Sequence, residues 1–139
     1  MPHAIVDNGL RWHVRAFDRK SQSFRDFVLT RISKVTIMET PKEVELAAED
    51  TDWQRLIPLL LVPHPKNIEH PVALEMDYGM KSGQLLLNVR AAMAGYLLRR
   101  WNVDCTEQAT LQGAEYQLWL QNRADLPNTT NLENFEYGM

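Results

Sequence analysis

The sequence is poor in cysteine and has no long apolar run. Its 139 residues include one cysteine, Cys105, so an internal disulfide is excluded. A lone thiol is typical of a protein from a reducing cytoplasm. No apolar run approaches the roughly 20 residues that cross a bilayer, and the start, MPHAIVDNGL, lacks the features of a signal peptide. These absences predict a cytoplasmic protein without a membrane partner.

The sequence also lacks the short motifs of common catalytic and metal sites. It contains no P-loop, no GxGxxG, no GxSxG and no HExxH. His64 and His70 have no second ligand at zinc-site spacing, and Cys105 has no His or Lys beside it in sequence. The carboxylates of residues 43–52 lack the glycine and terminal glutamate of a calcium loop. We therefore expect no enzyme, no cofactor and no metal.

Charge is distributed unevenly along the chain, although the net charge is only −3. Residues 1–40 hold seven basic and four acidic residues, whereas the remainder holds eight basic and fourteen acidic residues. A basic segment beside an acidic one indicates a local anion site rather than a protein coated with nucleic acid.

Residues 4–37 predict a three-stranded antiparallel meander. The apolar residues 4–6, the turn-forming DNG at 7–9 and the alternating WHVRAFD at 12–18 predict a hairpin, and residues 24–37 predict another long strand. Three such strands cannot close a barrel, so they need further strands or a covering layer.

The rest of the chain predicts a mixed unit. Acidic residues 39–53 predict a connection that ends in a short helix at 53–56, capped by Thr51 or Asp52. The further elements predicted from proline positions and apolar periodicity are a buried strand at 59–62, a hairpin of strands 72–78 and 84–90, a helix at 91–101, a strand at 113–122 and a loose tail at 128–139.

Basic side chains on the first long strands, with one aromatic neighbour, are the candidate ligand-binding residues: Arg25, Arg31, His13, Arg15, Arg11 and Trp12. Adjacent antiparallel strands lie about 5 Å apart, so we expect the basic side chains of the two strands to converge on a shared face, with the Trp12 ring nearby. Arginine binds phosphate bidentately and stacks on bases, which predicts a nucleotide or oligonucleotide site. The alternative left open is that these arginines pair with the acidic residues 43–52.

Two strand motifs resemble the WYL domain. Trp12 is the literal residue of the Trp-Tyr-Leu triplet, with His13 and Val14 in the other two places, and FRDFVLTRI carries the R-x-F-x-L-x-R-I pattern from Arg25 to Ile32. Three further segments, DTDWQRLIPLLLVPHP, EMDYGMKSGQLLLNVRAAMAGYLLRRW and YQLWLQNRADL, resemble the C-terminal extension of one branch of WYL regulators. That branch includes transcriptional repressors linked to bacterial phage-defence islands.

The resemblance implies an α+β fold. A partial Sm/SH3-like antiparallel β-barrel over 1–40 would precede a small α/β extension over 41–127 and a flexible tail over 128–139. The winged helix-turn-helix and first WYL strands of that family have no counterpart in this sequence, which predicts a truncated or naturally shortened product. We therefore expect no operator recognition by this chain alone, and the open barrel edges predict a homodimer or higher oligomer.

The resemblance also implies a function, because WYL domains sense ligands, with nucleotide-like molecules and nucleic acids as the main class. The chain would then be the ligand-sensing portion of a transcriptional regulator, with Arg25 and Arg31 as the leading contacts because their motif matches. His13 stands in the place of the motif tyrosine. The alternative is a dimerisation or protein-interaction module in which the ligand site is vestigial.

Overall fold

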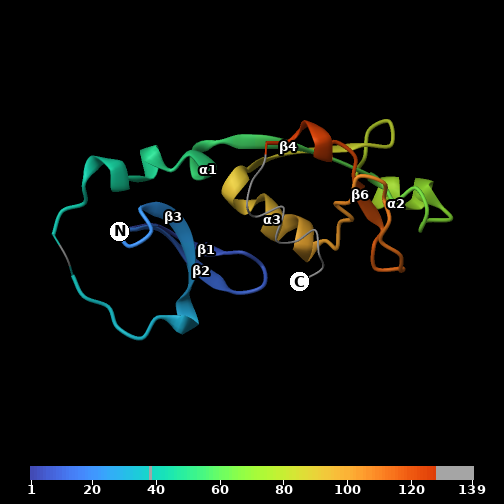
Figure 1. Ribbon diagram of the computed structural model, residues 1–139. Helices are drawn as coiled ribbons and strands as arrows, with labels where there is room; N and C mark the ends of the chain where they lie inside the picture. The colour runs from blue at the N-terminus through green and yellow to red at the C-terminus, as the bar shows by residue number, and fades with distance from the viewer. Residues whose placement is uncertain (38, 128–139) are drawn as a thin grey trace. The chain divides into compact units, whose positions relative to one another are not determined.

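The computed structural model describes residues 1–37 and 39–127 (Figure 1). The chain forms two compact units, Met1–Arg55 and Leu56–Met139, each built on a three-stranded antiparallel sheet. The mixed helix and strand content agrees with the predicted α+β class. The described residues form two open sheets and no closed barrel, so the Sm-like barrel is not formed by this part of the chain.

The first unit contains the predicted meander, with strands β1 (Pro2–Asp7), β2 (Trp12–Asp18) and β3 (Ser23–Val28) in that order across the sheet. The turn between β1 and β2 forms because the Asn8 side chain accepts hydrogen bonds from the backbone N–H groups of Leu10 and Arg11. Gly9 supplies a φ of +86° there, which glycine adopts without steric cost.

The predicted strand at 24–37 is wrong beyond Val28. Val28 pairs with His13, and β2 begins one residue before His13, so the following residues have almost no partner strand. The chain turns instead through a short 3₁₀ helix, η1 (Leu29–Arg31), and continues as an exposed segment to residue 37. Strand length is therefore limited by the length of the neighbouring strand rather than by local propensity.

The acidic connection folds as part of the first unit. It contains two 3₁₀ helices, η2 (Glu43–Glu45) and η3 (Ala47–Glu49), and a short helix, α1 (Thr51–Gln54). The helix lies earlier than the predicted 53–56, and its N-cap is Asp50 rather than Thr51 or Asp52, because the Asp50 side chain accepts from the Trp53 backbone N–H. Residues 41–55, predicted to open the extension, thus lie in the first compact unit.

The second unit packs helix α3 (Ala91–Arg100) along one face of a sheet ordered β5-β4-β6 (Figure 1). Its strands are β4 (Leu56–Pro63), β5 (Leu85–Arg90) and β6 (Leu118–Leu120). The core is apolar and includes Ile57, Leu59, Leu61, Leu98, Leu118 and Leu120, each almost completely buried. The predicted helix at 91–101 and the predicted strand at 59–62 are confirmed, because both have strong apolar patterns.

Two predicted strands of the second unit are wrong in type or length. Residues Pro71–Asp77 form helix α2, since proline at the first helical position presets the backbone angle and Leu74 is buried on one side. The predicted strand at 113–122 is only β6, because it pairs with β4 only through Leu61–Pro63. A 3₁₀ turn, η4 (Arg123–Asp125), follows. The predicted tail at 128–139 lies outside the described residues.

Candidate functional site

The alternation of β2 divides its side chains between two differently exposed faces. His13 and Arg15 are 1% and 6% exposed, whereas Trp12 is 53% exposed. We call the covered side the inner face, with His13, Arg15, Phe17, Phe24 and Asp26. The other side is the outer face, with Ile5, Trp12, Val14, Arg25 and Phe27.

The expected convergence of all the basic side chains on one face is wrong. In the β2–β3 register, Arg15 lies opposite Asp26 and Ala16 lies opposite Arg25. Directly opposed residues share a face, so Arg25 lies on the outer face while His13 and Arg15 lie on the inner face. The register follows from the turn that joins the strands, and a shift by one residue would exchange the faces.

Arg15 is held on the inner face by two carboxylates. Its Nε and Nη2 donate to the two oxygens of Asp50 at 2.8 and 2.9 Å, and its Nη1 lies 3.2 Å from Asp26 Oδ1. Burial opposes ionisation of Asp50, but the hydrogen bonds from Arg15 and His3 outweigh it and hold the pKa of Asp50 below its ordinary value. Burial alone would lower the pKa of Arg15, but its interactions with Asp50 and Asp26 outweigh this effect, so the pKa of Arg15 lies above its ordinary value. Arg15 is therefore a buried, fully charged structural residue.

Two histidines complete this buried polar layer. His3 Nε2 lies 2.8 Å from Asp50 Oδ2. The Asn8 amide nitrogen donates to His13 Nδ1 at 3.0 Å, so Nδ1 is an acceptor and the ring proton lies on Nε2, 3.5 Å from Asp26 Oδ1. Burial lowers the pKa of His13, with the nearby Asp26 acting in the opposite direction. His13 is thus an uncharged group under the sheet, not an exposed base.

Arg19 and Glu45 form a second link between the sheet and the acidic connection. Arg19 Nε and Nη2 lie 2.5 and 2.9 Å from the two Glu45 oxygens. The Arg19 hydrogen bonds, together with the Lys42 backbone N–H, lower the pKa of Glu45 to about 2. Of the candidate arginines, Arg15 therefore realises the alternative pairing with acidic residues 43–52, and Arg19, which was not a candidate, forms a second pair of this kind.

The outer face keeps its cationic and aromatic groups accessible. The Arg25 side chain is 58% exposed, with Nη1 3.4 Å from Asp18 and the guanidinium carbon 5.9 Å from the centre of the Phe27 ring. Arg11 precedes β2 and Arg31 ends η1; both are exposed, and within residues 1–37 and 39–127 neither forms an ion pair. Of the six predicted ligand-binding residues, Arg11, Trp12, Arg25 and Arg31 are therefore exposed, and His13 and Arg15 are buried.

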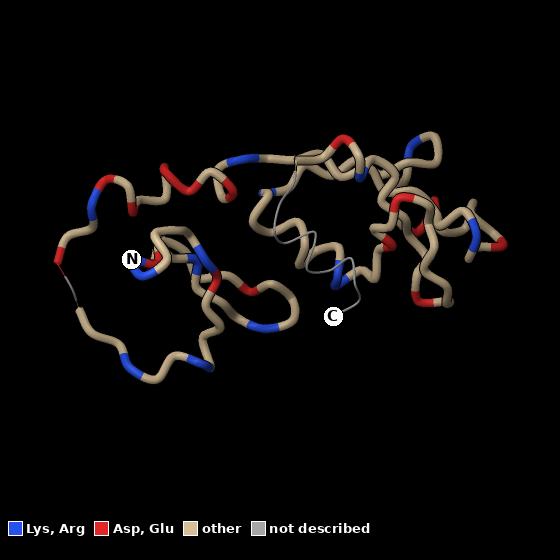
Figure 2. Tube along the Cα trace, in the orientation of Figure 1, with Lys and Arg blue, Asp and Glu red and all other residues tan. Residues whose placement is uncertain are grey.

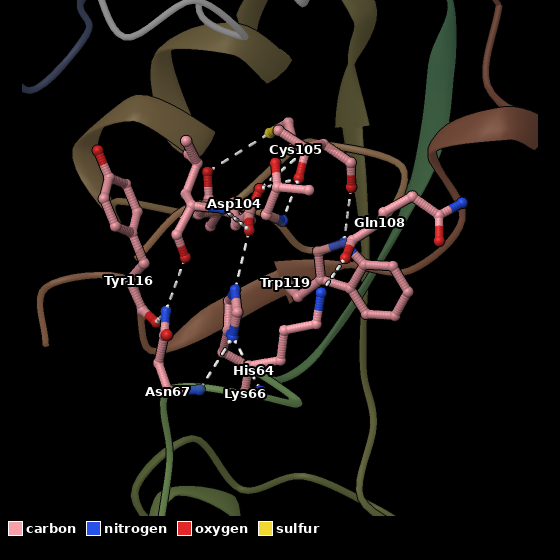
Figure 3. Close-up of polar contacts among 12 residues, drawn as sticks. His64, Lys66, Asn67, Asp104, Cys105, Gln108, Tyr116 and Trp119 are labelled. Carbon is pink, nitrogen blue, oxygen red and sulfur yellow. Dashed lines mark hydrogen bonds and ion pairs between the residues drawn. The ribbon is translucent and has the colours of Figure 1, made fainter. Parts of the chain in front are cut away.

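The second unit contains a buried polar network that joins two loops (Figure 3). His64 and Asp104 are fully buried, and His64 Nε2 donates to Asp104 Oδ2 at 2.8 Å. His64 Nδ1 accepts from the backbone N–H groups of Lys66 and Asn67, and Asp104 accepts from Thr106 as well. Burial alone would raise the pKa of Asp104. The hydrogen bonds that Asp104 accepts lower it by a larger amount, so its pKa lies below the ordinary value.

This network is structural because every polar atom of its two central side chains is engaged with protein. His64, interpreted from sequence as an ordinary loop histidine, connects the loop after β4 to the loop after α3. Within residues 1–37 and 39–127, no group of three or more His, Cys, Asp or Glu side chains is arranged to hold a metal ion. In the same residues, no helix is both long and apolar enough to cross a membrane.

Sequence reasoning missed Asp26 as a partner of the inner face, and its alternative pairing with residues 43–52 did not single out Asp50. The local signal was Asp26, which is the one acidic residue inside the third strand and alternates with Arg25 and Phe27. Asp50 lies 35 residues from Arg15, and no periodicity links them. Figure 2 shows acidic and basic residues interspersed through the first unit, whereas the strand β4 and most of α3 carry no charge.

Two family models match the chain. Residues 1–37 match the WYL domain, and residues 56–126 match the BrxR transcriptional regulator, C-terminal dimerization domain. The second match covers just over half of the chain, from the start of β4 to the end of the described core.

Curated relatives carry the name DNA-binding transcriptional repressor CapW. The protein from Pseudomonas aeruginosa is 36% identical over 126 residues, and that from Escherichia coli (strain KTE188) is 35% identical over 127 residues. Each alignment covers 90% of this chain and 41% of the relative. The protein from Stenotrophomonas maltophilia is 38% identical over 104 residues, or 74% of this chain and 34% of the relative. The chain thus spans about two-fifths of the length of the relatives that it matches.

Proposed function

The chain belongs to the WYL-domain transcriptional regulators that carry a BrxR-type C-terminal dimerization domain, and we propose that its first unit binds an anionic, nucleotide-like effector. Family and relatives are transcriptional regulators rather than enzymes. The proposed role is accordingly recognition without bond chemistry. The effector would be a nucleotide or a short single-stranded nucleic acid, bound on the outer face.

The observation that carries this proposal is an exposed guanidinium beside exposed aromatic rings on one sheet face. Arg25, Phe27 and Trp12 all lie on the outer face, and the Arg25 guanidinium is within cation–π distance of the Phe27 ring. Aromatic rings stack on bases, and an arginine fork binds phosphate through paired hydrogen bonds. A face of this kind matches a ligand that has both a base and a phosphate.

The remaining predicted residues take different parts in this proposal. Arg11 and Arg31 are exposed on the segments that flank β2 and β3, where they would add phosphate contacts. His13 and Arg15 hold the sheet from beneath, because their polar atoms face Asp26 and Asp50. They are positioning residues for the outer face rather than ligand contacts.

Residues 56–126 would supply self-association, which the match to a dimerization domain supports. The relatives are named as DNA-binding repressors, so the proposed whole-protein role is repression that an effector modulates. No operator contact is proposed for the described residues. The alternative, a dimerisation module with a vestigial ligand site, is favoured by the same match and differs only in predicting no effector binding.

Fluorescence anisotropy with a labelled single-stranded hexanucleotide tests the effector site. We expect micromolar binding that weakens with salt, and a loss of about tenfold or more in Arg25→Ala and in Arg31→Ala. Each lost phosphate contact should also reduce the salt slope by about 0.7. Lys20→Ala is the matched control, since Lys20 is an exposed base of the same unit outside the outer face.

Binding that is unchanged in both arginine variants would contradict the assigned face. Absence of binding by the folded wild-type chain would contradict the effector role and leave the dimerisation module as the better account.

A further inference from the structure

Strand β4 is apolar on both of its faces. Its sequence, LIPLLLVP, places Ile57, Leu59 and Leu61 in the core, where they are almost completely buried. The alternate residues are apolar as well, and Leu56 among them is 62% exposed. A strand that is apolar on both faces is typical of a sheet covered by two layers. In the described residues of the second unit, α3 covers the core face, and Leu74 of α2 also packs into that core.

The uncovered side of this sheet forms a continuous apolar surface, which we call the open face. Leu60 of β4 lies opposite Leu86 of β5, and Pro58 lies opposite Asn88, so these side chains share one face. Leu86 is 59% exposed. Among the residues that β4 and β5 place there, Arg90 at one end is the charged one. A depression of about 400 Å³ at the opposite end is lined by Leu60 and Leu86, with Lys81 at its edge on the loop before β5.

We propose that the open face is where a second copy of this chain packs, sheet against sheet. The proposal rests on the self-association proposed above and specifies the surface that produces it. A nearly uncharged apolar face is self-complementary, because two copies related by a two-fold axis meet without like-charge repulsion. The match to a dimerization domain begins at residue 56, the first residue of β4, and includes both strands of the open face.

Another apolar surface of the second unit is a weaker candidate. Val72 and Met76 are exposed on α2, one helical turn apart. They lie on a seven-residue helix beside Glu75 and Asp77, so acidic groups accompany them. Two side chains on one short helix also present less apolar area than two paired strands. This makes Met76 a matched control for a residue of the open face.

Light scattering coupled to size-exclusion chromatography tests the open face. We expect the wild-type chain to be a dimer, and Leu86→Asp to be a monomer at the same concentration, with a dissociation constant raised by about 100-fold or more because two like charges would be desolvated together. Met76→Asp should remain dimeric. Leu86 is already exposed, so the circular dichroism spectrum should not change. Asn88→Arg, also on the open face, should weaken the dimer through the same repulsion between like charges. It provides a second test if Leu86→Asp does not fold.

The outcomes separate this proposal from the one on which it rests. A monomeric wild-type chain would overturn self-association itself. A dimeric wild type with dimeric Leu86→Asp and Asn88→Arg would overturn only the open face, and monomeric Met76→Asp in that case would assign the contact to α2. Hexanucleotide binding by Leu86→Asp should equal that of the wild type, because Leu86 lies in the other unit from the outer face.

Discussion

The two units of this chain cover their sheets with opposite chemistry. In the second unit, leucines of β4 and β6 pack against α3 and form an apolar core. In the first unit, the covered face presents His13, Arg15 and Asp26 beside the rings of Phe17 and Phe24, and the segment that contacts it contributes Asp50. The first sheet is therefore anchored by buried ion pairs and hydrogen bonds together with aromatic packing, whereas the second is anchored by apolar burial.

This difference determines which side chains each unit leaves exposed. Because the polar side chains His13, Arg15 and Asp26 are used for internal pairing, the outer face keeps Trp12 and Phe27 exposed beside Arg25. In the second unit, β4 carries apolar side chains on both of its faces. Helix α3 covers one face, and the apolar side chains of the other remain exposed on the open face. One unit thus exposes a mixed aromatic and cationic surface, for which we propose a nucleotide-like anion, and the other exposes an apolar surface, for which we propose a second copy of the chain.

Removing Asp50 should have the largest effect on the first unit. Asp50→Ala leaves Arg15 buried with only Asp26 and removes the partner of His3, so we expect a loss of about 3–5 kcal/mol. Hydrogen exchange by mass spectrometry should show faster exchange across residues 1–55 and unchanged exchange across 56–126. Asp52→Ala, an exposed neighbour, should cost less than about 0.5 kcal/mol. Equal effects of the two substitutions would show that the ion pairs do not anchor this sheet.

Acidification should weaken the first unit in two steps. Burial lowers the pKa of His13 below 6.5, so the unfolded chain binds that proton more readily and stability falls as the pH drops below about 6.5. The pKa of Glu45 is about 2 in the folded chain and 4.5 when unperturbed, so its contribution is present above pH 4.5 and is lost as the pH falls through about 2.

Urea unfolding followed through the amide resonances of residues 12–18 at a series of pH values measures both steps. His13→Gln should remove the first step, and Glu45→Gln should remove the Glu45 part of the second. A first step that persists in His13→Gln would assign it to another group.

Removing Arg25 should have the smallest effect on stability. Its side chain is mostly exposed and its contact with Asp18 is long, so Arg25→Ala should change the free energy of unfolding by less than about 0.5 kcal/mol in urea titration. This separates Arg25 from Arg15, which lies one strand away but on the inner face. A loss above about 1 kcal/mol would make Arg25 a structural residue and remove the basis for using it as a ligand probe.

The elements that sequence predicted well are those whose pattern is local. The β1–β2 hairpin follows from DNG and strict alternation, and α3 follows from a run of good helix formers. Helix α2 was missed because a seven-residue segment with one buried leucine fits either period. The length of β6 depends on its partner β4. The paired residues Leu61 and Leu120 are far apart in the sequence, so no local pattern marks where β6 begins and ends.

The candidate site was predicted only in part, for a related reason. Basic residues on one strand face were expected to face solvent, but their partner Asp50 arrives from a distant segment and converts that face into the interior. The residues Arg25 and Arg31, found through their strand motif, are exposed. The sequence of a strand does not show which of its two faces will be covered, because the segment that covers it lies elsewhere in the chain.

Hydrogen exchange of the wild-type chain, with and without the hexanucleotide, tests most directly whether the effector binds the first unit and not the second. The account predicts that the ligand slows exchange within residues 1–37 and leaves residues 56–126 unchanged. Protection confined to residues 56–126, or none at saturating ligand, would contradict it.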